Sequence, residues 1–106
     1  MIVEMRTYTC KPGATAEYMR IYEAEGFPVQ GRILGNLVGW YTTEFGALNQ
    51  IVHMWAYQDF ADRARRRAEL AASKEWQAVL AKLRDLILTQ ENKILAPAPW
   101  SPKVGG

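Results

Sequence analysis

A predicted β-hairpin over residues 36–57 constrains the fold of this chain more than any other segment. Residues 36–43 and 48–57 are rich in β-branched and aromatic side chains, and the short stretch between them contains Gly46. This composition is typical of two antiparallel strands joined by a turn. The segment therefore predicts a sheet, and its second strand carries the most distinctive side chains of the chain.

The second strand of this hairpin places three chemically unusual side chains in one row. Alternate residues of a strand point to opposite faces, so Asn49, His53 and Trp55 are expected on one face, opposite Val52 and Met54. His53 is the single histidine of the chain. Two interpretations are open: the row lines a ligand site, or it forms a hydrogen-bonded layer of the core.

Strand and helix patterns alternate along the first part of the chain. Residues 2–9 alternate in polarity as a strand does, and Pro12 with Gly13 interrupts this pattern. A helix with apolar residues at spacings of three and four follows. We expect this helix to end at Gly26, because glycine adopts the left-handed conformation at low cost and a nearby proline cannot continue a helix.

The second helical region contains two candidate N-caps. Asp59 is the first, with Asp62 three positions later as a capping-box-like carboxylate, and Ser73 is the second. We therefore expect a kink or a short break at Ser73. The apolar stripe predicted before this break consists of Phe60, Ala64, Ala68 and Ala71. The stripe predicted after it consists of Trp76, Val79, Leu80 and Leu83.

A last strand over residues 86–94 completes the order β-α-β-β-α-β. This order is the ferredoxin-like arrangement of the α+β class, with a four-stranded antiparallel sheet. Residues 96–106 are predicted to be an extended tail, because its closely spaced prolines exclude a helix. No repeat or linker divides the chain, so residues 1–106 are predicted to form a single domain.

Composition excludes several classes of partner. A net charge of +2 is too small to indicate nucleic-acid binding. No window approaches the 18 consecutive apolar residues of a membrane span, and the N-terminus has no signal-peptide pattern. A single cysteine, Cys10, is consistent with a reducing compartment. We therefore expect a cytoplasmic protein with no nucleic-acid or membrane partner.

Both faces of the predicted central strands are partly apolar. One face carries Val3, Met5, Val52 and Met54, and the other carries Tyr8, Ile51, Trp55 and Tyr57. Two helices cover only one face, and at ~25 cal/mol per Å² of apolar surface an uncovered face would lose several kcal/mol of stabilisation. A second copy of the chain, packed sheet against sheet, removes this loss, so we expect a homodimer.

Several short motifs of this sequence resemble those of the NIPSNAP family. They are Glu4-x-Arg6-x-Tyr8, Pro12-Gly13, Val38-Gly39, Glu44-x-Gly46-x-Leu48-Asn49, His53-x-Trp55-x-Tyr57, Arg63-x-x-x-Arg67 and Gln90-Glu91-Asn92. Together they cover nearly the whole chain. The resemblance implies the dimeric α/β-barrel superfamily, whose relatives include antibiotic-type monooxygenases, muconolactone isomerases and haem-using enzymes. It implies no defined activity for the NIPSNAP domain itself.

Charged and aromatic side chains of the first strand adjoin the histidine row. In the ferredoxin-like order the first strand pairs with the third, so Arg6 and Tyr8 are expected beside His53 and Trp55. Arg6 needs a carboxylate or an anionic ligand, because charges are rarely buried without a partner. An internal ion pair is the structural alternative to a ligand. Arg67, on the second predicted helix, is expected to point inward, where a guanidinium can clamp a carboxylate.

A metal or haem site is not expected. One histidine and one cysteine on different strands fall short of the three or four protein ligands that zinc needs. In the haem-using relatives that the resemblance implies, the proximal histidine lies on a helix, whereas His53 is on a predicted strand. We therefore expect no cofactor.

Two functions from different classes remain open. The first is binding of a small aromatic or carboxylated molecule in a pocket between sheet and helices, with cofactor-free oxygenation or isomerisation as the reaction. In it His53 is the acid/base group and Arg6 or Arg67 holds an anion. The remaining candidate ligand-binding residues are Tyr8, Asn49 and Trp55.

The second function is a non-catalytic binding or protein-interaction module that acts as a homodimer. A water-accessible His53 favours the first, and a filled core around it favours the second.

Overall fold

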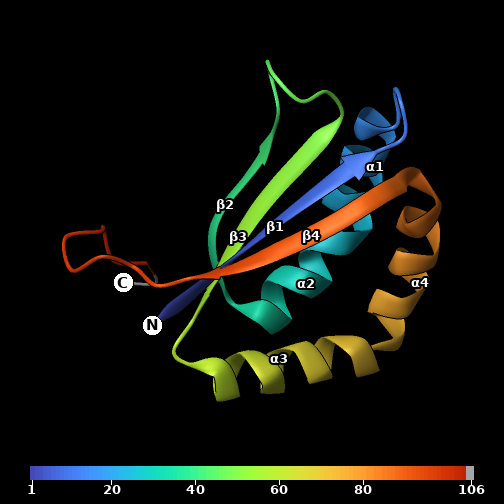
Figure 1. Cartoon of the computed structure of the whole chain (residues 1–106). Coiled ribbons are helices and arrows are strands. Elements are labelled where there is room, and N and C mark those ends of the chain that lie inside the picture. Colours follow the sequence, from blue (N-terminus) through green and yellow to red (C-terminus); the bar gives the residue numbers. More distant parts are fainter. Residues whose placement is uncertain (105–106) are drawn as a thin grey trace.

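Four antiparallel strands form one sheet in the order β2-β3-β1-β4, and the helices cover one of its faces (Figure 1). The computed structural model describes residues 1–104. The strands are β1 (Ile2–Cys10), β2 (Asn36–Thr42), β3 (Gln50–Tyr57) and β4 (Ile87–Leu95). The first strand lies between the third and the fourth, as the ferredoxin-like arrangement requires. The predicted α+β fold class is confirmed.

The connection between β1 and β2 is one continuous helical path. Its parts are α1 (Thr15–Ile21), a π-helical turn (Tyr22–Gly26) and α2 (Phe27–Leu34). The prediction that the helix ends at Gly26 is therefore wrong. Gly26 has helical dihedral angles, and an added Cβ would lie 2.7 Å from a ring carbon of Tyr22, so this glycine makes room for an aromatic ring. Pro28 is tolerated because it lies in the first turn of α2, and the path ends at Gly35 with φ +88.

The second helical region begins and breaks at the predicted caps. Its parts are α3 (Phe60–Ala72), α4 (Lys74–Leu83) and a 3₁₀ turn (Arg84–Leu86). The Asp59 side chain accepts a hydrogen bond from the Asp62 N–H at 2.8 Å, and Ser73 Oγ accepts one from the Trp76 N–H at 3.2 Å. The predicted break at Ser73 is confirmed, and in the stripe after it Trp76, Val79 and Leu83 are buried while Leu80 is partly buried.

The apolar stripe predicted for α3 does not face the core. Phe60 is 62% exposed, and the three alanines of that stripe are exposed as well. The inward side of α3 carries Asp62, Leu70 and several arginines, of which Arg66 contacts α2 and Arg63 reaches Glu4 on the sheet. Alanine methyl groups contribute little buried area, whereas the stems of arginine can pack on apolar surface while their guanidinium groups form ion pairs.

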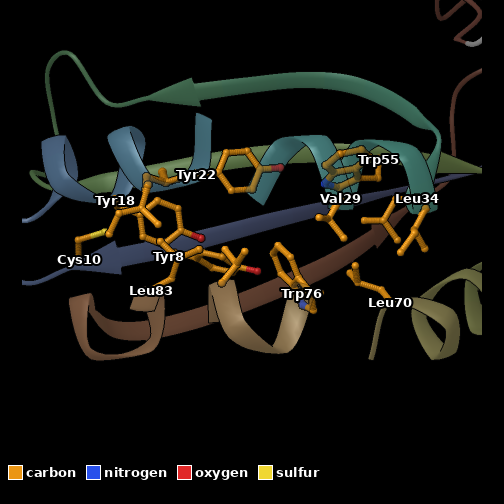
Figure 2. Close-up of a cluster of buried hydrophobic side chains, with 14 of the residues drawn as sticks. Tyr8, Cys10, Tyr18, Tyr22, Val29, Leu34, Trp55, Leu70, Trp76 and Leu83 are labelled. Carbon is orange, nitrogen blue, oxygen red and sulfur yellow. The ribbon is translucent and has the colours of Figure 1, made fainter. Parts of the chain in front are cut away.

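The two faces of the sheet differ in burial as the alternation predicts. On the helix-covered face Tyr8 lies opposite Ile51, and both are buried. On the open face Met5 lies opposite Met54, and both are partly exposed. Figure 2 shows the buried side chains between the sheet and the helices, with Tyr8, Tyr18 and Leu83 at one end and Trp55, Leu34 and Leu70 at the other.

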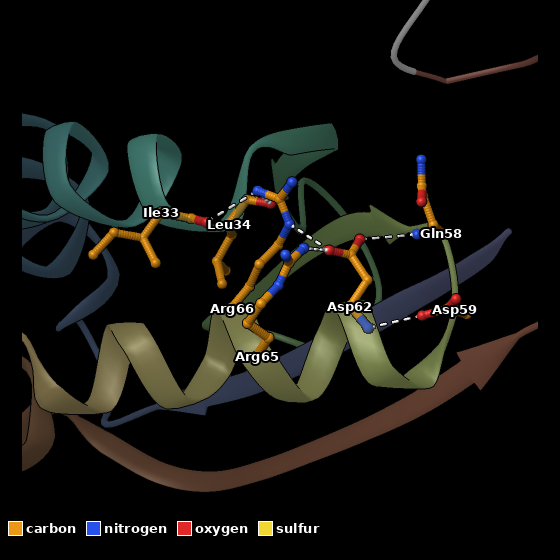
Figure 3. Close-up of polar contacts among 7 residues, drawn as sticks. All are labelled: Ile33, Leu34, Gln58, Asp59, Asp62, Arg65 and Arg66. Carbon is orange, nitrogen blue, oxygen red and sulfur yellow. Dashed lines mark hydrogen bonds and ion pairs between the residues drawn. The ribbon is translucent and has the colours of Figure 1, made fainter.

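Arg66 joins α3 to the end of α2 (Figure 3). Its Nε donates to the Asp62 carboxylate at 3.0 Å, and its Nη1 donates to the carbonyls of Ile33 and Leu34 at 3.2 and 3.3 Å. The last carbonyls of a helix have no partner within the helix, so a guanidinium there acts as a C-terminal cap. Arg66 reaches them because Gly35 has no side chain: an added Cβ would lie 2.7 Å from Nη1.

The chain after β4 is non-helical, as predicted for the tail. The Ser101 N–H donates to the Ala98 carbonyl at 2.9 Å in a turn, and Trp100 is exposed. Residues 105 and 106 of the predicted tail lie outside the described residues. Over residues 1–104, every helix is too short or too polar to cross a membrane.

Two glycine substitutions test the Arg66 cap. Gly13 and Gly35 both have positive φ, but an added Cβ at Gly13 meets no atom within 4 Å. Gly13→Ala should cost only the backbone strain of about 1–2 kcal/mol. Gly35→Ala should cost roughly 1–3 kcal/mol more, because Arg66 must leave the helix end and because φ +88 with ψ −84 lies outside the left-handed helical region. Urea unfolding of both variants measures the difference, and equal losses would show that the cap contributes nothing.

Candidate functional site

The centre of the site is Glu4, a fully buried carboxylate on β1. Its Oε2 accepts hydrogen bonds from Arg6 Nη1 at 3.0 Å, Arg63 Nη2 at 2.7 Å and Asn92 Nδ2 at 2.7 Å. These partners come from β1, α3 and β4. Burial alone would raise the pKa of Glu4, but the hydrogen bonds from Arg63 and Asn92 and the charges of Arg6 and Arg63 outweigh it and lower the pKa to about 2. Glu4 is therefore ionised at neutral pH.

Two guanidinium groups, those of Arg6 and Arg63, contact this carboxylate, and a third, that of Arg67, lies in its electrostatic field. Besides its bond to Glu4, Arg6 donates from Nε to the Tyr8 hydroxyl at 2.8 Å. Arg67 lies one turn after Arg63 on the same side of α3, and its Nη1 is buried with no hydrogen-bond partner among the described residues. Burial and the charge of Arg6 lower the pKa of Arg67. We define Glu4, Arg6, Arg63 and Arg67 as the guanidinium cluster, and it carries a surplus of positive charge.

His53 lies opposite Arg6 in the pairing of β1 with β3, and only 1% of it is exposed. Its Nδ1 accepts a hydrogen bond from Trp55 Nε1 at 2.7 Å. Burial, followed by the charges of Arg6 and Arg67, lowers the pKa of His53 to about 3, so the ring is neutral at physiological pH. A neutral imidazole that accepts at Nδ1 carries its proton on Nε2. His53 Nε2 is therefore a hydrogen-bond donor in this arrangement, and the role of His53 as an acid/base group stays a prediction.

Aromatic rings enclose the histidine. The Tyr8 ring meets it edge-on with centroids 5.0 Å apart, and the Trp40 ring stacks on it at 5.6 Å. Trp40 also stacks on Tyr22 of the π-helical turn at 5.0 Å. Sequence reasoning missed Trp40 because the pairing of β2 with β3 shifts between Leu37 and Gly39, which breaks the alternation of faces. The adjacent Gly39 was the available signal of such an irregularity.

Several buried polar atoms around the cluster have no hydrogen-bond partner within residues 1–104. They are Glu4 Oε1, His53 Nε2, Tyr57 Oη, Arg63 Nε and Arg67 Nη1. Folded proteins satisfy nearly all buried polar groups, so such a concentration points to an occupant such as ordered water or a ligand. Most of these atoms are donors, so the arrangement suits a molecule rich in acceptor oxygens. Tyr57 was not among the predicted site residues, although it shares the strand face of His53.

Five of the six predicted site residues meet at this place. Arg6, Tyr8, His53 and Arg67 contribute to the cluster or contact it, and the buried Trp55 orients His53. Asn49 is the exception: it precedes β3 with φ +61, and its Oδ1 accepts a hydrogen bond from the Gly13 N–H at 3.2 Å. This contact holds two loops together, because asparagine tolerates positive φ and bonds readily to nearby backbone.

The described residues contain no group of three or more His, Cys, Asp or Glu side chains arranged to hold a metal ion. The donors of the guanidinium cluster suit an anion instead, since guanidinium, phenol and imidazole N–H groups are hydrogen-bond donors. The arrangement can therefore bind a carboxylate or stabilise negative charge on an oxygen.

Comparison with known proteins identifies relatives over almost the whole chain. The sequence model of the family described as NIPSNAP matches residues 3–102. The human protein NipSnap homolog 3A is 35% identical over 99 residues, which are 92% of this chain but 39% of the human protein. This chain thus spans about two fifths of that relative's length.

Solved structures agree with these sequence matches. A crystal structure of a NIPSNAP family protein from Agrobacterium tumefaciens is 48% identical, has a TM-score of 0.94, and is matched over 96% of this chain and 92% of that chain. A structure described as an antibiotic biosynthesis monooxygenase has a TM-score of 0.62 at 12% identity, over 93% of this chain and 100% of that chain. The second likeness concerns the fold alone.

The low pKa of Glu4 predicts how stability depends on pH. Because the folded-state pKa of about 2 is below the ordinary value of 4.5, Glu4 stabilises the fold above pH 4.5, and this stabilisation is lost as the pH falls toward 2. Complete loss of this stabilisation lowers the free energy of unfolding by roughly 3 kcal/mol. Glu4→Gln should be less stable at pH 7 and should lose less on acidification. Urea unfolding between pH 7 and pH 2 measures this, with the exposed Glu69→Gln as the matched control. Parallel pH profiles for Glu4→Gln and the parent chain would contradict it.

Proposed function

This chain belongs to the NIPSNAP family, and we propose that it binds a small organic acid at the guanidinium cluster. The carboxylate of the ligand accepts hydrogen bonds from Arg67 Nη1 and Arg63 Nε. His53 Nε2 and the Tyr57 hydroxyl donate to further oxygens of the ligand. Tyr8 forms part of the apolar wall, and Trp55 orients His53.

The observation that carries this proposal is the charge imbalance of the cluster. Arg6 and Arg63 form ion pairs with one carboxylate, and Arg67 Nη1 is buried without a partner among the described residues. Ordered water would satisfy the hydrogen bonds of these groups but carries no charge. An anion satisfies the hydrogen bonds and also neutralises the surplus positive charge. Burying a guanidinium without a counter-charge costs several kcal/mol, and such a cost is typical of binding sites.

Catalysis is the second candidate, and the neutral His53 favours one form of it. A neutral imidazole N–H can stabilise an oxyanion or an enolate as it forms, which would suit a cofactor-free isomerisation or oxygenation. Such a reaction also needs a base to remove a proton. His53 has its proton on Nε2, and Glu4, with a pKa of about 2, is a weak base. Binding without chemistry is therefore the better-supported function.

We also propose that the open face of the sheet is covered by a second copy, which gives a homodimeric α/β barrel. Val3, Met5 and Met54 are only partly buried on this face, and Tyr41 beside them is 53% exposed. Apolar side chains in such a row indicate an interaction surface. The unpaired Cys10 fits a reducing compartment, and we propose a cytoplasmic location.

Removing the Arg67 charge should separate binding from stability. Arg67→Met keeps the apolar stem and removes an unpartnered charge, so it should raise the melting temperature and abolish binding of benzoate and acetate. Arg63→Met should instead lower stability by roughly 1–3 kcal/mol, because Glu4 loses a hydrogen bond. Thermal melts and calorimetric titration measure both. A destabilised Arg67→Met variant, together with no binding of either acid to the parent chain, would sink the proposal.

The dimer has its own test. Light scattering at micromolar concentration should give about twice the 12.0 kDa of one chain. Met54→Glu introduces a charge into the proposed interface and should yield a monomer with a lower melting temperature. Ala78→Glu, at an exposed position on α4, is the matched control and should leave the mass unchanged. A parent chain with the mass of a monomer would contradict the sheet-to-sheet dimer.

A further inference from the structure

A groove lies on the other side of Trp40 from the histidine. It has a volume of about 660 Å³ and is lined chiefly by apolar and aromatic side chains of α1, the π-helical turn, α2 and β2. They include Ala16, Met19, Tyr22, Phe27, Pro28 and Trp40. Its volume lies in the range of small-molecule sites. Met19 and Phe27 are 40% and 39% exposed, so the groove presents apolar surface to solvent.

Two backbone irregularities build the inner wall of this groove. The shift in pairing between Leu37 and Gly39 turns Trp40 toward the helices, and the π-helical turn places Tyr22 against it. β-Bulges re-aim side chains next to functional sites, and π-helical turns recur at such sites. Trp40 Nε1 is buried and has no well-aligned acceptor among the described residues, although the Tyr22 hydroxyl lies near enough to interact with its proton. A buried indole N–H normally forms a full hydrogen bond, so an oxygen of a ligand would complete one here.

The stacked rings of Trp40, which lines the groove, and His53, which lies opposite Arg6 in the strand pairing, are placed between the groove and the guanidinium cluster. The two rings are 5.6 Å apart, and His53 in turn lies in the field of Arg6 and Arg67. At the rim of the groove Arg20 and Glu23 carry opposite charges. The groove therefore has an apolar wall and a rim whose charges cancel. The surplus positive charge of the guanidinium cluster lies beyond Trp40.

We propose that the groove and the guanidinium cluster are two parts of one site, and that its ligand is an aromatic carboxylic acid. The aromatic body lies in the groove against Trp40 and Phe27, and the carboxylate is drawn to Arg67. Trp40 rotates away from the His53 ring, so that the carboxylate passes between the two rings to the cluster, and the Trp40 N–H then donates to an oxygen of the ligand. This inference rests on the proposed binding function. It adds an aromatic body to the ligand and names Trp40 as the residue that selects for it.

Three probes and two matched variants test the inference by calorimetric titration. The probes are acetate, 2-naphthoate and the neutral 2-naphthalenemethanol. Ala16→Trp fills the groove from an exposed position on α1, and Ala78→Trp adds the same side chain on α4, away from the groove. Ala16→Trp avoids the core, so a thermal melt equal to that of Ala78→Trp establishes that it is folded.

The parent chain should bind 2-naphthoate ~10-fold or more tightly than acetate, because the ring adds buried apolar area. Ala16→Trp should weaken 2-naphthoate binding by ~10-fold or more and leave acetate binding within about 2-fold, while Ala78→Trp should change neither. Trp40→Phe, which keeps a ring but removes the N–H, should also weaken 2-naphthoate binding.

The other outcomes overturn the inference in distinguishable ways. If acetate binds in an Arg67-dependent manner but 2-naphthoate binds no tighter, the proposed function stands and the groove has no part in it. If 2-naphthalenemethanol binds as tightly as 2-naphthoate and Arg67→Met does not matter, the groove is a separate site for neutral molecules. If none of the probes binds, the proposed function fails and the inference fails with it.

Discussion

The pairing of the buried Glu4 carboxylate governs how this chain packs its helices on its sheet. A carboxylate with no solvent contact needs several donors, and they arrive from β1, α3 and β4. Because Arg63 must reach Glu4, α3 presents its arginine side to the sheet and leaves Phe60 and its alanines exposed. The same orientation brings Arg66 to the end of α2 and Arg67 into the interior. One ion pair thus decides which face of a helix is internal.

This arrangement places more positive charge in the interior than the fold itself requires. Arg6 and Arg63 have a structural partner in Glu4, whereas no partner of Arg67 is found among the described residues. A stable core of this size does not need such a residue, because hydrophobic side chains of similar volume usually stabilise as well or better. The sequence left two interpretations open, a ligand site and a hydrogen-bonded core layer. This surplus of positive charge is the feature that best distinguishes them.

The sequence predicted features that depend on local rules and missed those that depend on tertiary contacts. Side-chain alternation correctly grouped Tyr8 and Trp55 on one face of the sheet, and the caps at Asp59 and Ser73 are local hydrogen bonds. The inward side of α3 was missed, since helical periodicity counts apolar residues and gives no weight to arginines that form ion pairs. Trp40 was missed because a β-bulge shifted its face, which no pattern of alternation encodes.

The register of β3 also determines what chemistry His53 can perform. Residues two apart on a strand share a face, so Trp55 is placed to donate to His53 Nδ1 and thereby fixes the proton on Nε2. Arg6, opposite in the register, and Arg67 from α3 keep the ring neutral through their charges. The likeness to a monooxygenase structure extends to the backbone, but this hydrogen-bond pattern makes His53 a donor. The donor role that His53 has in the proposed anion site therefore rests on the strand pairing itself, whereas a role as a base would require Trp55 to release Nδ1.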